Sequence, residues 1–280
     1  MFMDTQKALS IEEIHNSTLD IVKRLSDICE ILNINYYVAY GSLIGAIRHK
    51  GFIPWDDDFD VIMMRPDYDK FIDYCKNNEK KLSPFKLLNR EVCVDYPYTI
   101  SRFEDMRYKA VYDSVTEYDS GMFVDIYPFD GAGSDEKKTM RKIAWRKRIL
   151  AKCVDWSIKK NYASPKGKKI IKSFFKYIGF KATHIIGKDF FLNQYEKLGT
   201  YYSFDQSSLV GCLCWDGDCT LFNKSLFGEA LTLPFETLEV KVPVGYDEIL
   251  KKLYGEYMKL PPEKDRIPTH EYTLYRRKEY

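Results

Sequence analysis

The stretch from residue 36 to 64, YYVAYGSLIGAIRHKGFIPWDDDFDVIMM, constrains the fold of this chain more than any other feature. The apolar run from Tyr36 to Tyr40 predicts a short buried strand, which Gly41-Ser42 ends. The following LIGAIRH can begin a helix, and the free N–H groups at a helix start bind anions. Asp58 to Met64 then predicts a second strand. The pattern therefore places a helix start and an acidic cluster beside the ends of two strands.

Four carboxylates crowd into the cluster Asp56-Asp57-Asp58-Phe59-Asp60. Side chains two apart on a strand share a face, so Asp58 and Asp60 point the same way. They repel each other unless a cation lies between them, and such hard oxygen ligands suit Mg²⁺, with Mn²⁺ as an alternative. Asp56 alternates with them and is a candidate for binding substrate. A solvated acidic loop is the simpler alternative.

A calcium loop of the EF-hand type is disfavoured. Asp56, Asp58 and Asp60 match its first three ligand positions, but it requires Gly where Val61 stands and Glu where Asp67 stands.

A third carboxylate, Asp125, lies in the apolar strand pattern FVDIY. A buried carboxylate without a partner is costly. We therefore expect Asp125 to join Asp58 and Asp60 at the metal as the catalytic set. The alternative is a core aspartate paired with an arginine.

The turn and the helix after it supply candidates for binding a phosphate group. Gly41 lets a phosphate approach the backbone closely, and the Ser42 hydroxyl can add a hydrogen bond. Arg48 can reach a diphosphate because its guanidinium pairs with phosphate oxygens, with His49 and Lys50 as alternatives.

The remaining periodicity predicts one α/β (α+β) domain, residues 1–280, with a mixed sheet flanked by helices. Ser10 and Glu13 form a capping box at the start of an amphipathic helix. The expected helices are 10–33, 67–77 and 246–257, with a basic helical insertion over 134–200. The expected strands are 97–103, 107–115 and 121–128, with a turn at Glu104-Asp105 and short strands over 207–243.

Composition is that of a folded protein, with 45% hydrophobic residues in 280. We expect a cytoplasmic chain, since no signal pattern or membrane-spanning apolar run is present. Seven cysteines fit reduced thiols. The cluster of Cys212, Cys214 and Cys219 lacks zinc-site spacing and a nearby fourth ligand.

Residues 137–188 contain seventeen Lys or Arg and one acid, a net of +16 in a chain of net +2. The remainder therefore has a net of −14. This asymmetry predicts an anionic partner for the segment. An anionic membrane surface is the expected partner, and nucleic acid is not expected because no binding motif is present. The alternative is a solvated helix pair that balances the acidic remainder.

The segment GSLIGAIRHKGFIPWDDDFD resembles the LicD family, which includes bacterial phosphorylcholine transferases and is similar to the fukutin-related transferases. The resemblance returns at GMFVDIYPFDG (121–131) and YDEILKKLYGEYMKLPP (246–262). It implies a nucleotidyltransferase fold of the polymerase-beta type. The family pattern also places an aspartate at the position of Asp125.

The resemblance implies a metal-dependent transferase that moves a phospho-alcohol, most simply phosphocholine, from a CDP-activated donor to a sugar hydroxyl. The acceptor would be a cell-surface glycan precursor of the teichoic acid or lipopolysaccharide kind. The charge of the basic segment, and not the resemblance, adds the expectation of a place at the inner face of the membrane, where a lipid-linked acceptor would be found. Relatives use ribitol phosphate, so the alcohol stays open. The alternatives are true nucleotidyl transfer to a protein, RNA or small molecule, and a non-catalytic basic module that binds nucleic acid.

Overall fold

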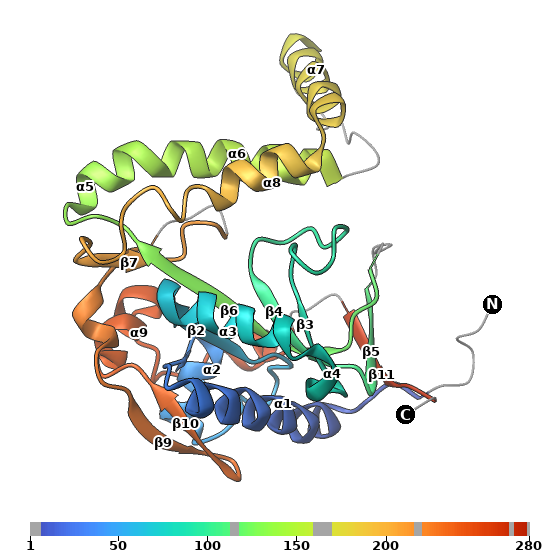
Figure 1. The fold of residues 1–280 in the computed structure, drawn as a ribbon, viewed down its shortest axis with the longest axis vertical. Helices are drawn as coiled ribbons and strands as arrows, with labels where there is room; N and C mark the ends of the chain where they lie inside the picture. Colours follow the sequence, from blue (N-terminus) through green and yellow to red (C-terminus); the bar gives the residue numbers. More distant parts are fainter. Residues whose placement is uncertain (1–6, 113–117, 159–169, 216–219, 269–271, 279–280) are drawn as a thin grey trace. The chain divides into compact units, whose positions relative to one another are not determined.

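The computed structural model describes residues 7–112, 118–158, 170–215, 220–268 and 272–278, without the side chains of 170–175. Its helices are α1 (Ile11–Leu32), α2 (Tyr40–Ile44), α3 (Arg65–Asn77), α4 (Glu79–Leu82), α5 (Glu136–Thr139), α6 (Trp145–Ile158), α7 (Ile170–Ile186), α8 (Lys188–Glu196) and α9 (Tyr246–Tyr254). Shorter helical segments are η1 (Gly45–His49), η2 (Met140–Ala144), η3 (Lys224–Phe227) and η4 (Glu263–Asp265). Figure 1 labels the helices and most strands along the chain.

Its strands are β1 (Tyr37–Val38), β2 (Asp60–Met64), β3 (Phe85–Leu88), β4 (Ser101–Asp105), β5 (Tyr108–Tyr112), β6 (Met122–Gly131), β7 (Leu209–Gly211), β8 (Phe222–Asn223), β9 (Leu231–Phe235), β10 (Leu238–Val242) and β11 (Tyr272–Arg276).

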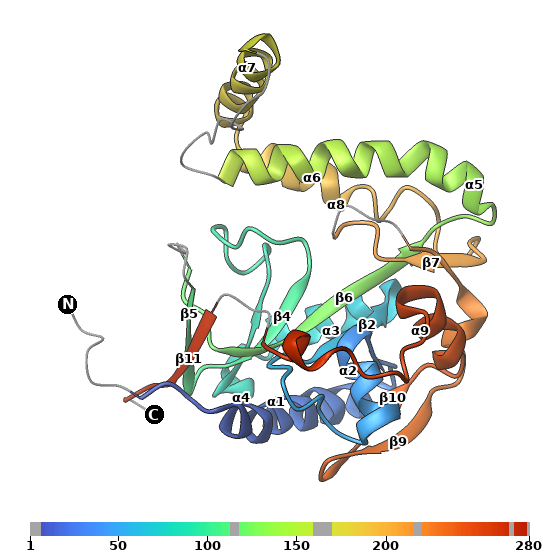
Figure 2. The ribbon, with the colours of Figure 1, turned by 180° about the vertical axis from the view of Figure 1, so that it is seen from behind.

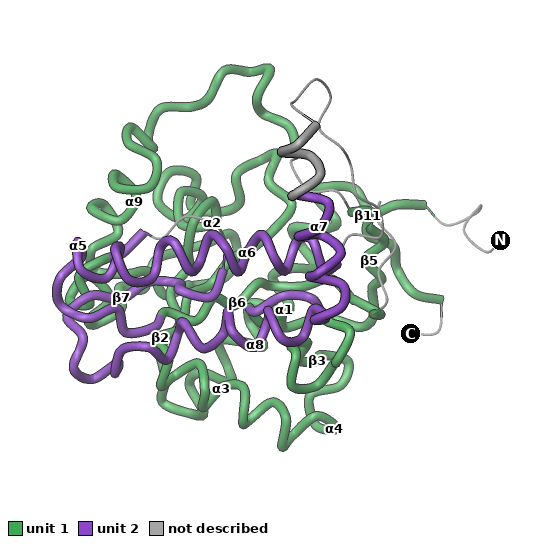
Figure 3. The backbone as a smooth tube through the Cα atoms, turned by 90° about the horizontal axis from the view of Figure 1, so that it is seen from above, with its two compact units in different colours: residues 1–96, 100–129, 222–280 green, residues 97–99, 130–221 purple. Residues whose placement is uncertain are grey.

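The chain forms two compact units, which Figure 3 colours separately. Unit 1 comprises residues 1–96, 100–129 and 222–280, and unit 2 comprises residues 97–99 and 130–221. The predicted basic insertion, 134–200, lies within unit 2. There, η2, α6 and α8 contribute to a small apolar core that includes Ile143, Tyr195 and Leu198, and α7 packs on α6 and α8.

A mixed sheet with the strand order β1-β2-β6-β4-β3 forms the centre of unit 1. β2 runs parallel to β6, whereas the other neighbours along this order are antiparallel. Helices α1 and α3 cover one face, and α2 with α9 lies on the other (Figures 1 and 2). All ten residues of β6 are buried, which fits a central strand covered on both faces. The predicted fold class is confirmed.

The first helix forms as predicted because its capping box is complete. The Ser10 hydroxyl accepts the N–H of Glu13 at 3.3 Å, and the Glu13 carboxylate accepts the N–H of Ser10 at 2.8 Å. Its buried face includes Ile21, Leu25 and Ile28. The helix ends at Asn33, which adopts the left-handed conformation common at helix ends.

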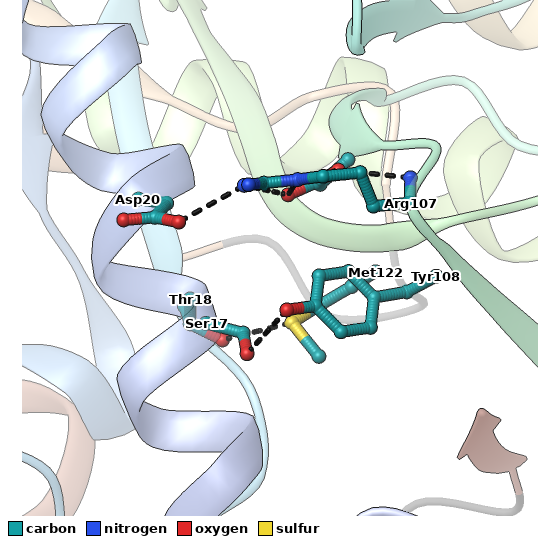
Figure 4. Close-up of polar contacts among 7 residues, drawn as sticks. Ser17, Thr18, Asp20, Arg107, Tyr108 and Met122 are labelled. Atoms are coloured by element: carbon teal, nitrogen blue, oxygen red, sulfur yellow. Dashed lines mark hydrogen bonds and ion pairs between the residues drawn. The ribbon is translucent and has the colours of Figure 1, made fainter. Parts of the chain in front are cut away.

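Polar contacts join α1 to the strands of unit 1, as Figure 4 shows. Ser17 and the Tyr108 hydroxyl lie 2.8 Å apart, and the Thr18 hydroxyl lies 3.6 Å from the sulfur of Met122. The Arg107 guanidinium donates to Asp20 at 2.9 Å. These residues are about 90 to 100 positions apart in sequence, so the contacts fix the helix on the sheet rather than stabilise it locally.

The structure corrects several predicted boundaries. The turn expected at Glu104-Asp105 is wrong: both residues are buried in β4, and the turn follows at 106–107. The Asp105 carboxylate accepts the backbone N–H of Arg107 and its guanidinium, which allows a charged residue to end a buried strand. The first strand is also shorter than expected, because Tyr40 turns into α2 with a φ of 47°.

Two strands, β3 and β11, had no predicted counterpart. β11 pairs with β5 at positions more than 150 residues apart, from Tyr272 opposite Tyr112 to Arg276 opposite Tyr108. Residues 97–100, expected in a strand, precede β4 instead. The last helix ends at Tyr254, earlier than predicted, because Gly255 takes a positive φ of 64°.

Candidate active site

Two of the predicted catalytic aspartates face each other across neighbouring strands. In the parallel pair of β2 and β6, Asp60 is the register partner of Asp125. Paired residues on adjacent strands present their side chains to the same face, with the strands about 4.8 Å apart. Both residues are buried. Asp58 lies two residues before Asp60 in extended chain and is half-buried. Strand register thus places Asp125 beside Asp60, and a shared catalytic role stays a prediction.

The acidic segment is held by residues from opposite ends of the chain. His15 of α1 donates from Nε2 to the carbonyl of Asp56 at 2.7 Å, and its ring stacks on Phe52 with centroids 4.2 Å apart. Tyr272 of β11 donates its hydroxyl to the carbonyl of Asp57 at 3.3 Å. These contacts fix the backbone that carries the carboxylates.

Gly41 and Ser42 contact the acidic segment itself. The Ser42 hydroxyl accepts the backbone N–H of Asp60 at 3.0 Å, at the first residue of β2. A Cβ on Gly41 would lie 2.7 Å from Oδ2 of Asp56, too close for any other residue unless that carboxylate moved. The turn predicted at Gly41-Ser42 is wrong, because both residues lie inside helix α2, which begins at Tyr40. Both residues contact the acidic segment, and their role toward phosphate stays a prediction.

The same carboxylates raise the pKa values of two nearby tyrosines. Burial raises the pKa of Tyr127 in β6, and the charges of Asp60, Asp125 and Asp58 raise it further. Partial burial also raises the pKa of Tyr254 at the end of α9, which is 46% exposed, with further contributions from Asp60, Asp56 and Asp58. Each hydroxyl thus lies in the field of the same aspartates. This places the end of α9 at the site.

Asp125 is paired with an arginine. Arg102 of β4 donates from Nε to Oδ1 of Asp125 at 2.8 Å and from Nη1 to the Tyr112 hydroxyl at 2.6 Å. Its guanidinium also lies 3.7 Å from the ring centre of Phe123. All of these groups come from β4, β5 and β6. The sequence alternative of a core aspartate paired with an arginine therefore describes this contact, and Arg102 fixes the orientation of Asp125.

Arg48, predicted to reach a diphosphate, contacts the chain after α9. It donates from Nη1 to the carbonyl of Tyr257 at 2.7 Å and to that of Lys259 at 3.3 Å. Burial, together with the charge of Arg266, lowers the pKa of Arg48. In this structure Arg48 connects η1 to the segment that follows α9, and contact with substrate stays a prediction.

Comparison with known proteins decides the family. The model of the LicD/FKTN/FKRP nucleotidyltransferase domain matches residues 33–168. The lipopolysaccharide cholinephosphotransferase LicD of Haemophilus influenzae is 30% identical over 270 residues, which cover 94% of this chain and 97% of that one. The chain belongs to the LicD family. Uncharacterized proteins of Rickettsia prowazekii and Rickettsia typhi are each 37% identical over 62 residues, 22% of this chain.

Membership of the LicD family makes the chain a transferase. The matched domain contains Asp58, Asp60 and Asp125, together with Gly41 and Ser42. The LicD domain match spans the boundary between the two units, because it ends at residue 168 and unit 2 includes residues 130–221.

The donor chemistry of this LicD site fits a divalent cation, since carboxylate oxygens are the ligands that Mg²⁺ prefers. Among the described residues, however, no three His, Cys, Asp or Glu side chains are gathered closely enough to hold a metal ion. Arg102 already contacts one oxygen of Asp125. Asp58 and Asp60 are therefore the pair that would hold the cation, and Asp125 as a third ligand stays a prediction.

Sequence reasoning named the acids of the LicD site but missed the groups that position them. His15 and Arg102, which contact Asp56 and Asp125, were not predicted to take part. Local pattern gave no signal for Arg102: charged residues on either side of Phe103 in SRFED are typical of a strand with one face in solvent, whereas Arg102 and Glu104 are buried. Which partner each charge meets follows from strand pairing, which the local pattern does not contain.

The cysteine cluster forms no disulfide among described residues. Cys212 and Cys214 are free, as are Cys29, Cys75, Cys93 and Cys153. The third member of the cluster, Cys219, lies outside the described residues.

Proposed function

We propose that this chain transfers a phospho-alcohol, phosphocholine in the first instance, from a CDP-activated donor to a sugar hydroxyl of a cell-surface glycan precursor. The observation that carries the proposal is the end-to-end similarity to the lipopolysaccharide cholinephosphotransferase of Haemophilus influenzae. The site supports it, because Asp60 pairs in register with Asp125 and Asp58 lies two residues before Asp60. We place the reaction at the cytoplasmic face of a membrane, where a lipid-linked acceptor would be available.

In the proposed reaction the acceptor oxygen attacks the phosphorus that carries the alcohol. A new oxygen–phosphorus bond forms, the bond to the bridging oxygen breaks, and CMP leaves with that electron pair. The hydroxyl proton must pass to a base. Asp125 is our candidate for orienting or deprotonating the hydroxyl, because Arg102 holds its carboxylate in a fixed orientation. A cation held by Asp58 and Asp60 would neutralise charge on the phosphate oxygens.

The polar residues around the cluster prepare this arrangement before substrate binds. Ser42 fixes the backbone of Asp60, and His15 fixes that of Asp56. Preorganised carboxylates need no rearrangement when a charged donor arrives, which favours the transition state. The geometry therefore supports chemistry at a charged phosphate group.

A second candidate is true nucleotidyl transfer, in which a nucleoside monophosphate moves to the acceptor and pyrophosphate leaves. The description of the matched domain as a nucleotidyltransferase favours it. The two reactions share the acidic cluster and differ in which phosphorus is attacked, so their products distinguish them.

The deciding experiment incubates the purified chain with Mg²⁺, a glycan acceptor preparation, and CDP-choline, CDP-ribitol or CTP in separate reactions. The proposal expects CMP release from a CDP-alcohol that depends on acceptor and is lost in Asp60→Asn. Substitution of Mn²⁺ for Mg²⁺ tests the alternative metal. Pyrophosphate from CTP, without CMP from any CDP-alcohol, would establish the second candidate instead.

A further inference from the structure

The charge of the chain is concentrated on the helices of unit 2. The seventeen Lys and Arg residues of segment 137–188 include Arg148 and Lys152 on α6 and Lys176 and Lys181 on α7, all exposed. Five others, Lys159, Lys160, Lys166, Lys168 and Lys169, lie outside the described residues. The described part of the segment already presents an exposed basic surface with one acid, Asp155.

One side of α7 packs against α6, within unit 2. A Cβ on Gly179 would lie 2.9 Å from the ring of Trp156 on α6, so the two helices approach closely at this glycine. Phe180 and Thr183 are buried on the same side. Figures 1 and 2 show that α7 runs at a steep angle to α6.

The opposite side of α7 is apolar and exposed. Residues at spacings of three, four and seven share a helix face. Ile178, Lys181 and Ile185 follow this spacing, and Ile178 is 47% exposed while Ile185 is 86% exposed. The Lys181 ammonium lies 5.7 Å from the ring centre of the exposed Tyr177. The outward face therefore alternates large apolar groups with a cation.

The exposed side of α6 has the same character. Trp145 is 55% exposed, and Ile149 and Lys152 follow it at the spacing of one face. The Lys152 ammonium lies 5.0 Å from the ring centre of Trp156. On the buried side of α6, the Lys147 ammonium donates to the carbonyl of Cys212 at 2.9 Å, and Ile143 of the preceding η2 is also buried. Trp156 follows on the same side of α6 as Trp145 and Ile149 and packs against Gly179 of α7, whereas Trp145 and Ile149 stay more than half exposed.

We propose that α6 and α7 form a docking surface for an anionic phospholipid bilayer. The surface comprises Trp145, Ile149, Lys152, Ile178, Lys181 and Ile185. Trp favours the membrane interface, and Lys can bury its methylene stem while its ammonium stays with the headgroups. The basic net charge attracts anionic lipid, and the isoleucines enter the acyl boundary.

A bilayer explains both properties of this surface. A nucleic acid would neutralise the lysines but would leave Ile178 and Ile185 exposed to water, so we favour the membrane. None of the described helices is long and apolar enough to cross a bilayer, and the proposed contact needs no crossing segment. The proposal rests on charge and exposure and not on the transfer reaction, so vesicle binding tests it without donor or acceptor.

The experiment sediments the full chain with vesicles of phosphatidylcholine alone or mixed with phosphatidylglycerol, at low and high salt. We expect binding only to the anionic vesicles, and weaker binding as salt rises. The double variant Ile178→Ser/Ile185→Ser should bind about tenfold more weakly. Lys152→Gln/Lys181→Gln should also weaken binding and reduce its dependence on salt.

Matched controls lie in unit 1. Ile31→Ser removes an isoleucine that is 65% exposed on α1, and Lys70→Gln removes an exposed lysine of α3. Both should bind vesicles like the parent, and circular dichroism should show the parent spectrum for every variant. Failure to bind anionic vesicles at low salt would overturn the proposal. So would equal binding to neutral vesicles, unchanged binding by the surface variants, or binding to single- or double-stranded DNA in place of vesicles.

Discussion

The sheet of unit 1 and the helices of unit 2 differ in whether their charged side chains are buried or exposed. On β4 and β6, charged residues are buried and each contacts a specific partner: Asp125 meets Arg102, and Glu104 accepts the Ser120 hydroxyl at 2.6 Å. Among the described side chains of α6 and α7, Lys147 is buried, but the other charged residues are exposed, as at Lys152 and Lys181, and nearly all have one sign.

The difference shows what each kind of charge can specify. A buried charge must be compensated where it lies, so it fixes the geometry of its neighbours. An exposed charge costs little, so many of one sign can gather and determine what the surface attracts. The acidic cluster combines buried and partly exposed charges, since Asp60 is buried and Asp58 is half-buried.

We expect the largest effect, a loss of transfer rate, from substitutions in the acidic cluster. Asp58→Asn and Asp60→Asn should each reduce transfer about a thousandfold or more, because each removes a ligand of the proposed cation. The fold should persist, since neutralising one carboxylate also relieves repulsion. CMP release and circular dichroism measure the two properties. Asp73→Asn, at an exposed position of α3, is the control. Near-normal rates in either cluster variant would show that the cation is held elsewhere.

The next effect concerns the buried ion pair. Arg102→Met should lower the free energy of unfolding by about 3–5 kcal/mol, because Asp125 would remain buried without its cation. The double variant Arg102→Met/Asp125→Asn should lose less than the sum of the two single losses. Urea denaturation measures this cycle. Additive losses would mean that the pair does not determine the geometry of β4 and β6.

Glu104 tests the same principle through pH. Burial raises the pKa of Glu104 to about 7, although the Ser120 hydroxyl and the charge of Arg102 lower it. A carboxyl with a raised folded-state pKa stays protonated in the fold after the unfolded chain has ionised. Its contribution to stability is therefore full below the unfolded pKa and declines as pH rises to about 7.

The Glu104→Gln variant cannot ionise and should not show this decline. Its free energy of unfolding relative to the parent should rise between pH 4.5 and pH 7, by at most about 2–3 kcal/mol, and level off above. Urea denaturation at a series of pH values measures the difference. Parallel curves for the two proteins would place the titration of Glu104 outside this range.

Substitutions at Gly41 and Ser42 test whether these residues affect donor affinity or only packing. Gly41→Val must displace the Asp56 carboxylate, so we expect about a tenfold loss of donor affinity. Ser42→Ala removes the acceptor of the Asp60 N–H, and we expect a loss of only a few-fold, near 1 kcal/mol. Calorimetric titration with CDP-choline compares them. Equal and small losses would indicate a structural role only.

We expect the smallest effect, on the free energy of unfolding, from an exposed lysine of the basic helices. Lys181→Gln removes one charge, as Asp60→Asn does, but at an exposed position. The free energy of unfolding should change by less than about 0.5 kcal/mol, because no buried partner loses its compensation. Urea denaturation is again the measurement. A larger destabilisation would show that this lysine supports the fold of unit 2.

Local pattern allowed much of the framework to be predicted. The capping box located the start of α1, alternating side chains located β2, and an apolar run located β6. The spacing of Asp58 and Asp60 identified the acidic cluster, and the apolar neighbours of Asp125 marked it as an unusual buried acid. Boundaries failed where a long-range contact decided them, as at Glu104 and Asp105, whose charges indicated a turn but are buried in β4.

The sequence by itself determined which residues can perform the chemistry, because residue type and spacing along one strand are local properties. Tertiary structure alone decided which groups position them. The register of β2 on β6 puts Asp60 beside Asp125, and the register of β4 on β6 brings Arg102 to the same carboxylate. These contacts join strands that are distant in sequence, and their partners follow from how the sheet packs rather than from any pattern within one segment.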